Sequence, residues 1–325
     1  MEFFLTDFLG APAWAWAGFF AIVVGLLAFD LGVLNKKDHE IGVTESLVLS
    51  AFYIAVACVF GGLIWVLQGH GPAIEYFTGY VVEKSLSLDN VFVISLIFAS
   101  FGVPRIYQHR VLFWGILGVI ILRGLMIGIG AALVREYHWV LFVFGGFLII
   151  TGIKMLVSPE HERPIAEHPV VKFLQRHIPL TQTIHGHDFV VREVNPKTGK
   201  LKFYATPLLL TLILVELADL VFAVDSIPAI FAITQDTFIV YSSNIFAILG
   251  LRALYFALAA IIHRFVYLKY ALAMVLVFIG GKIFYAEFVG HIDPVVSLGV
   301  TFSLLFLGMI VSVIITSFKP AKPHA

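Results

Sequence analysis

The chain is organised around two similar segments, EKSLSLDNVFV at residues 83–93 and DLVFAVDSIPA at residues 219–229. In each segment an acidic residue is followed six positions later by an aspartate and then by a small polar residue. The matching positions are Glu83, Asp89 and Asn90 in the first segment and Asp219, Asp225 and Ser226 in the second. The sequence therefore contains a duplicated set of carboxylates within apolar surroundings.

Landmarks that follow these segments extend the duplication. Ile-Leu-Gly recurs at 116–118 and 248–250, and Gly-x-Lys recurs at 152–154 and 280–282. The offsets between matching positions are 136, 132 and 128 residues, so the order is kept across three successive helices. Because three helices separate each landmark from its counterpart, we expect two three-helix units that insert with opposite orientations. Inverted repeats of this kind are typical of secondary transporters, whose binding sites lie near the membrane midplane.

The composition identifies the class of protein. Of 325 residues, 60% are hydrophobic and only 13% are charged, and the mean hydropathy is +0.98. Soluble domains carry about 25% charged residues, so a soluble enzyme, a disordered chain and a disulfide scaffold are excluded. The formal net charge of zero gives no reason to expect a nucleic-acid partner, and the single cysteine, Cys58, cannot form an internal disulfide. The predicted fold class is an all-α polytopic membrane protein.

Apolar stretches of about 20 residues predict nine membrane-spanning helices. They are expected at 14–34, 46–67, 77–101, 111–134, 139–157, 206–233, 240–262, 270–289 and 294–318. The corresponding organisation is N-terminal helices at 1–75, a first repeat at 76–157, a cytoplasmic loop at 158–205, a second repeat at 206–289, and a ninth helix with a tail at 290–325.

The distribution of basic residues predicts the orientation. With the N-terminus outside, fifteen Lys and Arg residues lie in inside loops and in the tail, whereas Arg135 alone lies in an outside loop. Cytoplasmic loops carry such an excess of Lys and Arg. We therefore expect a multi-pass protein of a bacterial inner membrane with a cytoplasmic C-terminus. In the long inside loop, DFVVREV and KLKFYAT flank the turn sequence NPKTG, which predicts a small β-hairpin.

Eleven Asp, Glu, Lys and Arg residues lie at least three residues inside the ends of the predicted spans. A charge at the bilayer centre costs at least about 2.5–3.5 kcal/mol, so these residues are expected to face inward, to pair or to contact water. Five of the acids lie on the third and sixth spans, and their polar neighbours make an oxygen-rich cluster that suits hard divalent cations such as Mn²⁺. The alternative is a purely structural network of buried ion pairs, in which the bases serve as charge partners. The acids are Asp30, Glu83, Asp89, Glu216, Asp219 and Asp225, and the bases are Lys84, Arg123, Lys154, Arg252 and Lys282.

Helix geometry leaves two arrangements open for the paired acids. A separation of six residues turns an α-helix by about 240°, so Asp219 and Asp225 do not share a face of a straight helix. Either each acid faces a different neighbour or the helix is distorted between them. Pro228 cannot donate to the carbonyl of Val224, which predicts an unwound turn at 224–228.

The segments EKSLSLDNVFV, ELADLVFAVDSIPAIFAIT and SNIFAILGLRALYF closely resemble the hallmark segments of the TerC integral membrane family, in particular its Alx-like bacterial branch. The resemblance extends over nearly the whole chain. It implies an association with tellurium resistance and with Mn²⁺ efflux, and an ion pathway formed by Glu83, Asp89, Glu216, Asp219 and Asp225. Weaker candidates are Asn90, Ser226, Asn244 and Asp30.

Two functions remain open at this point. The first is export of Mn²⁺ by alternating access, with protons as a coupling ion, since burial raises carboxyl pKa values in general. The second is a membrane partner or assembly factor for exported proteins that moves no ions. We expect no enzyme activity and no organic cofactor, because a redox enzyme is disfavoured by the single cysteine and by the absence of a haem-type histidine pair in the predicted spans.

Overall fold

The computed structural model describes residues 7–8, 10–30, 40–137, 139–157, 169–181, 183–194, 201–259, 268–290 and 292–318. A long helix overlaps each of the nine predicted ranges, and several helices extend beyond the predicted ends. These helices are α2 (Ala13–Phe29), α3 (Val43–Gln68), α4 (His70–Ser100), α5 (Arg105–Glu136), α6 (Val140–Val157), α8 (Pro207–Phe231), α9 (Thr237–Leu258), α10 (Leu268–Phe288) and α11 (Pro294–Phe318).

Seven helices in the described part of the chain are long and apolar enough to cross a membrane, and the protein is an all-α polytopic membrane protein. The other two long helices differ for separate reasons. Helix α2 has only 17 residues. Helix α4 has 31 residues but carries Glu75, Glu83, Lys84 and Asp89, which lower its hydropathy. The first acidic segment therefore lies on one of the two long helices that do not meet this criterion.

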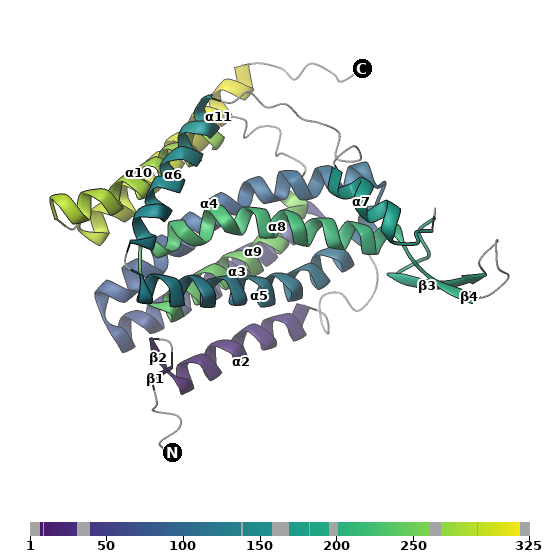
Figure 1. The fold of residues 1–325 in the computed structure, drawn as a ribbon, viewed down its shortest axis with the longest axis horizontal. Coiled ribbons are helices and arrows are strands. Elements are labelled where there is room, and N and C mark those ends of the chain that lie inside the picture. The colour runs from purple at the N-terminus through teal and green to yellow at the C-terminus, as the bar shows by residue number, and fades with distance from the viewer. Residues whose placement is uncertain are drawn as a thin grey trace.

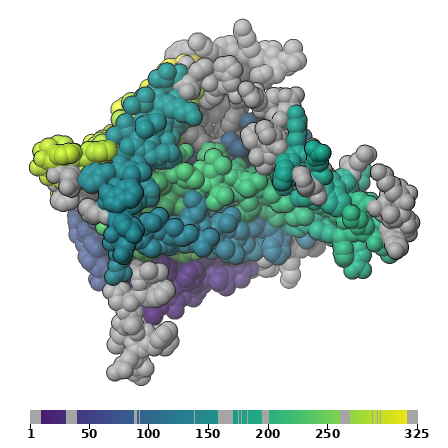
Figure 2. All heavy atoms as spheres, in the orientation of Figure 1, coloured from purple at the N-terminus to yellow at the C-terminus, as the bar shows by residue number. Residues whose placement is uncertain are grey.

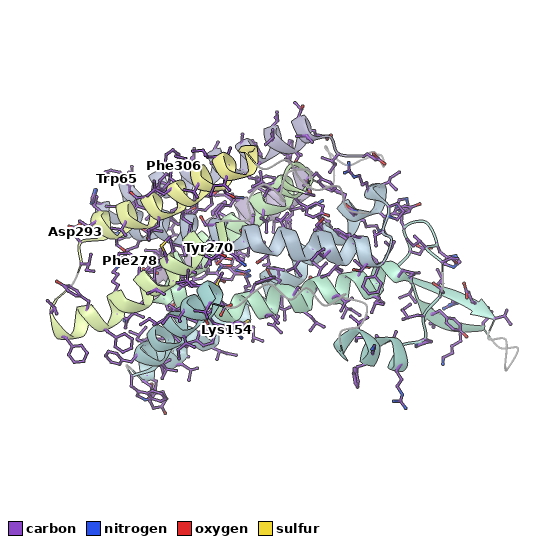
Figure 3. The ribbon with its side chains drawn as sticks, turned by 90° about the horizontal axis from the view of Figure 1, so that it is seen from above. Trp65, Lys154, Tyr270, Phe278, Asp293 and Phe306 are labelled. Atoms are coloured by element: carbon purple, nitrogen blue, oxygen red, sulfur yellow. The ribbon has the colours of Figure 1, made fainter. Side chains whose placement is uncertain are left out.

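The helices form two groups (Figure 1). Helices α2, α3, α4, α5, α8 and α9 run side by side, and α6, α10 and α11 form a group inclined to them. Helix α9 lies in the centre of the first group, since every residue from Phe238 to Ala253 is buried. Helices α3, α4 and α5 pack around it. The outer faces are apolar: Trp65 of α3 and Phe306 of α11 point away from the bundle with about half of each side chain exposed (Figure 3). In a bilayer these faces contact lipid.

Glycines allow α6 and α10 to approach at backbone distance. A Cβ atom on Gly152 would lie 2.7 Å from the Ala273 carbonyl oxygen, and one on Gly280 would lie 2.6 Å from the Gly145 carbonyl oxygen. A step of seven residues back along α6 moves the contact seven residues forward along α10, so the two helices are antiparallel. Small residues permit this close packing in membranes.

Gly280→Ala is expected to destabilise the protein by about 1–3 kcal/mol, the usual cost of overpacking. The added methyl group would meet the backbone of α6, which cannot move aside as a side chain can. The matched control is Gly281→Ala on the same helix, where nothing lies within 4 Å. Thermal unfolding of the two variants in detergent checks this, and equal melting temperatures would contradict the close helix contact.

The predicted hairpin in the long loop is confirmed. Strands β3 (Val190–Val194) and β4 (Leu201–Ala205) pair antiparallel, with Arg192 opposite Phe203. The predicted turn itself lies outside the described residues. The loop also contains α7 (Pro169–His177), and the chain begins with a short β1–β2 pair (Asp7–Phe8 with Ala11–Pro12), neither of which was predicted. Figure 2 shows α7 and the hairpin projecting from one end of the bundle.

The predicted unwound turn at 224–228 is wrong. Helix α8 stays α-helical through Pro228 and ends at Phe231. The residues from Ser226 to Phe231 are all buried against neighbouring helices. Tertiary packing of this kind holds a helix together despite the one hydrogen bond that a proline removes.

Candidate functional site

Arg123 of α5 is the centre of a buried polar cluster. Its side chain is fully buried, and its Nε and Nη2 donate to the two carboxylate oxygens of Asp219 at 3.0 and 2.8 Å. Its Nη1 forms an ion pair with Glu83 and also donates to Asn244 Oδ1 at 3.0 Å and Ser226 Oγ at 3.4 Å. The guanidinium of Arg123 therefore joins α4, α8 and α9. The sequence predicted Arg123 only as a charge partner.

Two buried oxygen atoms of this cluster have no hydrogen-bond partner among the described residues. Asn90 donates through Nδ2 to Asp219 Oδ1 at 3.4 Å, but its own Oδ1 is buried without a hydrogen-bond partner among the described residues. The same holds for Glu83 Oε2. Buried polar atoms are normally satisfied, and each exception asks for an explanation such as a missing ion or water.

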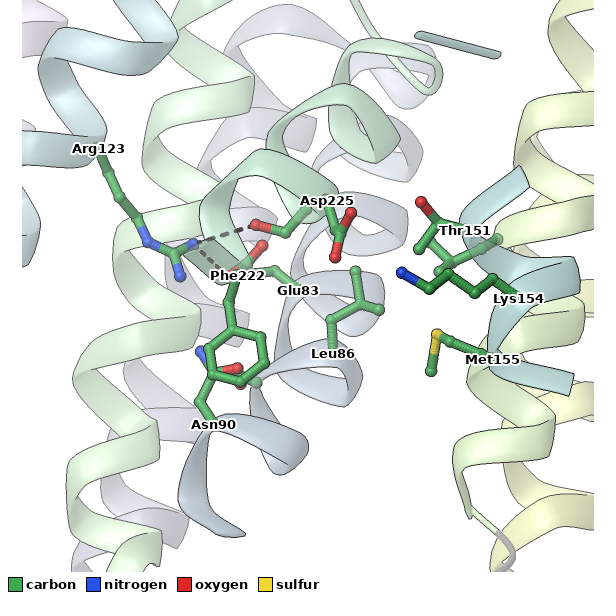
Figure 4. Close-up of a pocket in the computed structure, with 12 residues that line it drawn as sticks. Glu83, Leu86, Asn90, Arg123, Thr151, Lys154, Met155, Phe222 and Asp225 are labelled. Atoms are coloured by element: carbon green, nitrogen blue, oxygen red, sulfur yellow. Dashed lines mark hydrogen bonds and ion pairs between the residues drawn. The ribbon is translucent and has the colours of Figure 1, made fainter. Parts of the chain in front are cut away.

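These atoms border a cavity of about 350 Å³ between α4, α5, α6, α8 and α10. Glu83, Ser87 and Asn90 form one wall, and Asp225 lies across from Thr151 and Lys154 (Figure 4). Figure 4 shows the Lys154 ammonium pointing toward the Asp225 carboxylate. The remaining lining, which includes Leu86, Met155, Phe222 and Leu276, is apolar.

The two acids of the second segment face different neighbours, which decides between the two arrangements considered above. Asp219 points to Arg123 of α5, whereas Asp225 faces Thr151 and Lys154 of α6. The helix is regular between them. Among the described side chains at the cavity and around Arg123, three carboxylates, those of Glu83, Asp219 and Asp225, accompany two cations, Arg123 and Lys154, so this group carries a net charge of −1 when all are ionised. A cavity with these anionic groups in an otherwise apolar wall can accept a cation.

Glu216 and Lys84 lie apart from this cavity, each beside a glycine of the Ile-Leu-Gly landmarks. A Cβ on Gly118 of α5 would collide with the Glu216 carboxylate, and one on Gly250 of α9 would lie 2.7 Å from Lys84 Nζ. Lys84 donates to the Ala247 carbonyl at 3.3 Å. The matching glycines therefore make room for an ionisable side chain from the first helix of the other unit.

Asp30, Arg252 and Lys282 are also outside the cavity. Arg252 forms an ion pair with Asp30 and contacts His109. Lys282 donates to Ser297 Oγ at 3.3 Å. Of the predicted ligands, the structure therefore brings Glu83, Asn90, Ser226 and Asp225 to one cavity, with Asp219 and Asn244 behind them on Arg123. The Asp89 side chain lies outside the described residues.

The described residues contain no group of three or more His, Cys, Asp or Glu side chains placed to hold a metal ion. A cation in this cavity would be held by two carboxylates together with amide and hydroxyl oxygens. Thr151 was missed by the sequence reasoning, although it is the polar residue directly before the first Gly-x-Lys landmark. His109 was missed because the predicted span began after it, whereas α5 begins at Arg105.

The sequence of this chain is similar to those of known bacterial membrane proteins. The sequence model of the integral membrane protein TerC family matches residues 68–320. The uncharacterized membrane protein STKORF319 of Myxococcus xanthus is 46% identical over 97% of this chain and 96% of its own length. An uncharacterized membrane protein of Rickettsia felis is 47% identical over 92% of this chain and 97% of its own length. The putative membrane-bound redox modulator Alx of Escherichia coli K12 is 45% identical over 94% of this chain and 95% of its own length. No solved structure matches the chain.

Proposed function

The chain belongs to the TerC family of integral membrane proteins, and we propose that it exports divalent metal cations, chiefly Mn²⁺, through the central cavity. The observation that carries the proposal is the convergence of Asp225 with the oxygens of Glu83 and Asn90 that have no hydrogen-bond partner among the described residues, all on one cavity. Carboxylate and amide oxygens are the ligands that Mn²⁺ prefers, and no Cys or His among the described residues lines this cavity.

In this proposal the residues have distinct tasks. Asp225, Glu83 and Asn90 bind the substrate cation, and Ser87 and Thr151 offer weaker hydroxyl ligands. Arg123 holds Glu83 and Asp219 in place as a fixed internal cation. Lys154 reduces the negative charge beside Asp225, so that a bound divalent ion can leave again. Protons that replace the cation on these carboxylates would supply the coupling ion, and no organic cofactor is needed.

The packing of the helices supports alternating access by an inverted repeat. The counterparts in the two units are α4 and α8, α5 and α9, and α6 and α10. Helix α4 packs on α9 and α8 packs on α5, so the first helix of each unit packs on the second helix of the other. The third helices, α6 and α10, pack on each other. The contacts between α6 and α10 follow the offset of 128 residues found in the sequence. Gly280 is the counterpart of Gly152 and Ala273 is the counterpart of Gly145, and Gly152 meets Ala273 as Gly280 meets Gly145. Rocking of one unit against the other about these contacts would switch access to the cavity. We further propose nine membrane crossings, with α2 and α4 included, in a bacterial inner membrane with the C-terminus in the cytoplasm.

A role as an assembly factor for exported proteins is the second candidate function. The hairpin favours it, because Val190, Val194, Leu201 and Phe203 share one face of β3–β4 and are each about half exposed or more. The name redox modulator belongs to the Alx relative, and the one cysteine of this chain allows no internal dithiol chemistry.

Reconstitution of the purified protein in liposomes with an enclosed Mn²⁺-sensitive dye tests the proposed function. We expect saturable Mn²⁺ entry that depends on the protein and is inhibited by excess Mg²⁺ or Ca²⁺, because these hard cations compete for the same oxygen ligands. Mn²⁺ flux equal to that of protein-free liposomes, with or without a pH gradient, would contradict transport. A stable complex with an exported protein in that case would favour the second candidate.

A further inference from the structure

Polar side chains connect the central cavity to two smaller cavities. Asn90 lines both the central cavity and a second cavity of about 40 Å³, which Asp219 also lines. Arg252 lines both this second cavity and a third of about 10 Å³, which is bordered by Asp30, Tyr53 and His109. Shared residues thus order the three cavities into a series that starts at the candidate cation site and ends at the cavity beside Asp30 and His109.

Arg252 is held firmly between the last two cavities of this series. Its Nη1 pairs with Asp30 Oδ2 and its Nη2 contacts His109 Nε2. Because a guanidinium can only donate, His109 Nε2 is the acceptor. The guanidinium also lies over the ring of Phe113, with its Cζ 5.1 Å from the ring centroid. Asp30 and Arg252 are both buried, at 5% and 8% exposure. A charged, fully engaged side chain therefore stands between the second and the third cavity.

The location of the cluster indicates which end of the pathway it closes. Asp30 follows the last residue of α2, His109 lies in the second turn of α5, and Arg252 lies in the C-terminal part of α9. These three helix segments are at the same end of the bundle (Figure 1). The excess of basic residues in the adjoining loops predicts that this end faces the cytoplasm.

The backbone beside Arg252 is fixed independently of the guanidinium. Ser46 of α3 donates to the Ala253 carbonyl and accepts from the Ala257 amide at 3.0 Å. This clamp fastens the end of α9 to α3. Movement at this point is therefore more readily a swing of the Arg252 side chain than a shift of the helix.

We propose that Arg252 is the cytoplasmic gate of the ion pathway, kept closed by Asp30 and His109. This gate rests on the proposed transport function and adds a residue to it that neither the carboxylate pattern nor the family match assigns. When Arg252 releases Asp30 and His109, the second and third cavities join and the central cavity becomes accessible from the cytoplasmic end. With Arg252 in place, the cavity is closed on that side.

Thiol accessibility tests the gate without any measurement of transport. In a Cys58→Ser background, Met155→Cys places a single thiol on the wall of the central cavity. The rate of its reaction with a membrane-impermeant maleimide is measured from each side of the membrane, in vesicles of known orientation. The test variant combines Arg252→Met with Asp30→Asn, so that no unpaired charge remains buried.

The double variant is expected to react at least about tenfold faster from the cytoplasmic side, because a buried ion pair is opened only rarely while both partners are present. Reaction from the other side should be unchanged. The control Ser46→Ala loosens the same end of α9 without touching the guanidinium and should leave the rate within about twofold, since loss of one neutral hydrogen bond is a small effect. Arg252→Lys keeps the charge, so its thiol should react from the cytoplasmic side nearly as slowly as that of the parent thiol protein.

Equal rates for the double variant and the parent thiol protein would overturn the gate, and so would an equal acceleration by Ser46→Ala. These outcomes are separate from a failure of the proposed function. Normal Mn²⁺ transport with unchanged labelling contradicts the gate alone. Absent Mn²⁺ transport in the unmodified protein contradicts the substrate, whatever the labelling shows.

Discussion

Asp225→Asn is expected to abolish Mn²⁺ transport while leaving the protein folded. The substitution keeps the size of the side chain but removes one of the two carboxylates that the described residues place on the cavity wall, the other being that of Glu83 (Figure 4). Loss of even an outer-sphere partner typically costs about 10–100-fold in metal affinity, so loss of a direct anionic ligand should cost at least as much. Transport into liposomes and Mn²⁺ binding by the purified protein are the measurements.

The matched control is Glu193→Gln, which removes one acidic charge from the β3 strand, outside the helix bundle. It should transport at the rate of the unmodified protein. The melting temperature of Asp225→Asn shows whether the variant is folded, and Asp225 is only partly buried, so a large change is not expected. Transport by a folded Asp225→Asn protein at the unmodified rate would remove Asp225 from the pathway.

Arg123→Met is expected to lower the stability more than any other single substitution considered. It leaves the carboxylates of Glu83 and Asp219 in an apolar bundle without their shared cation. Removal of one partner from a buried ion pair typically costs about 3–5 kcal/mol. Here one guanidinium serves two acids and also Asn244, so we expect the upper part of that range, measured as a fall in melting temperature of more than about 5 °C.

A rescue experiment separates this electrostatic cause from a loss of packing. Combining Arg123→Met with Glu83→Gln and Asp219→Asn removes all three charges with little change in volume. Neutral replacements of a buried charge network are often tolerated, so most of the lost stability should return. A triple variant as unstable as Arg123→Met would show that Arg123 acts chiefly through packing.

Much of the fold followed from the sequence because bilayers impose simple rules. Apolar length located a helix at each of the nine predicted ranges, though several helices extend beyond them, and the Pro- and Gly-containing turn sequence located the β3–β4 hairpin. The exceptions are the two-residue strands β1 and β2 and the nine-residue helix α7 in a polar loop, where neither length nor hydropathy gives a signal. Pro228 misled the prediction because its local effect on α8 is overcome by tertiary packing.

The candidate site was predicted less completely, for a physical reason. The carboxylate pattern located the helices that carry the site, but pairing depends on which side chains meet across helices. Sequence spacing could not reveal that Arg123 engages Glu83 and Asp219 together, or that Glu216 lies apart beside Gly118. Where the sequence suggested a single cluster, Glu83 thus belongs both to the network around Arg123 and to the cavity that Asp225 lines, Asp219 belongs to that network, and Glu216 lies elsewhere.

The most direct test of the account is a crystal structure of the protein with Mn²⁺, with anomalous diffraction data recorded at the manganese edge. We expect one strong peak inside the central cavity, about 2.0–2.6 Å from oxygens of Asp225 and of Glu83 or Asn90, as hard cations require. Crystals of folded protein in high Mn²⁺ with a peak only at the surface, and a cavity free of manganese, would contradict it.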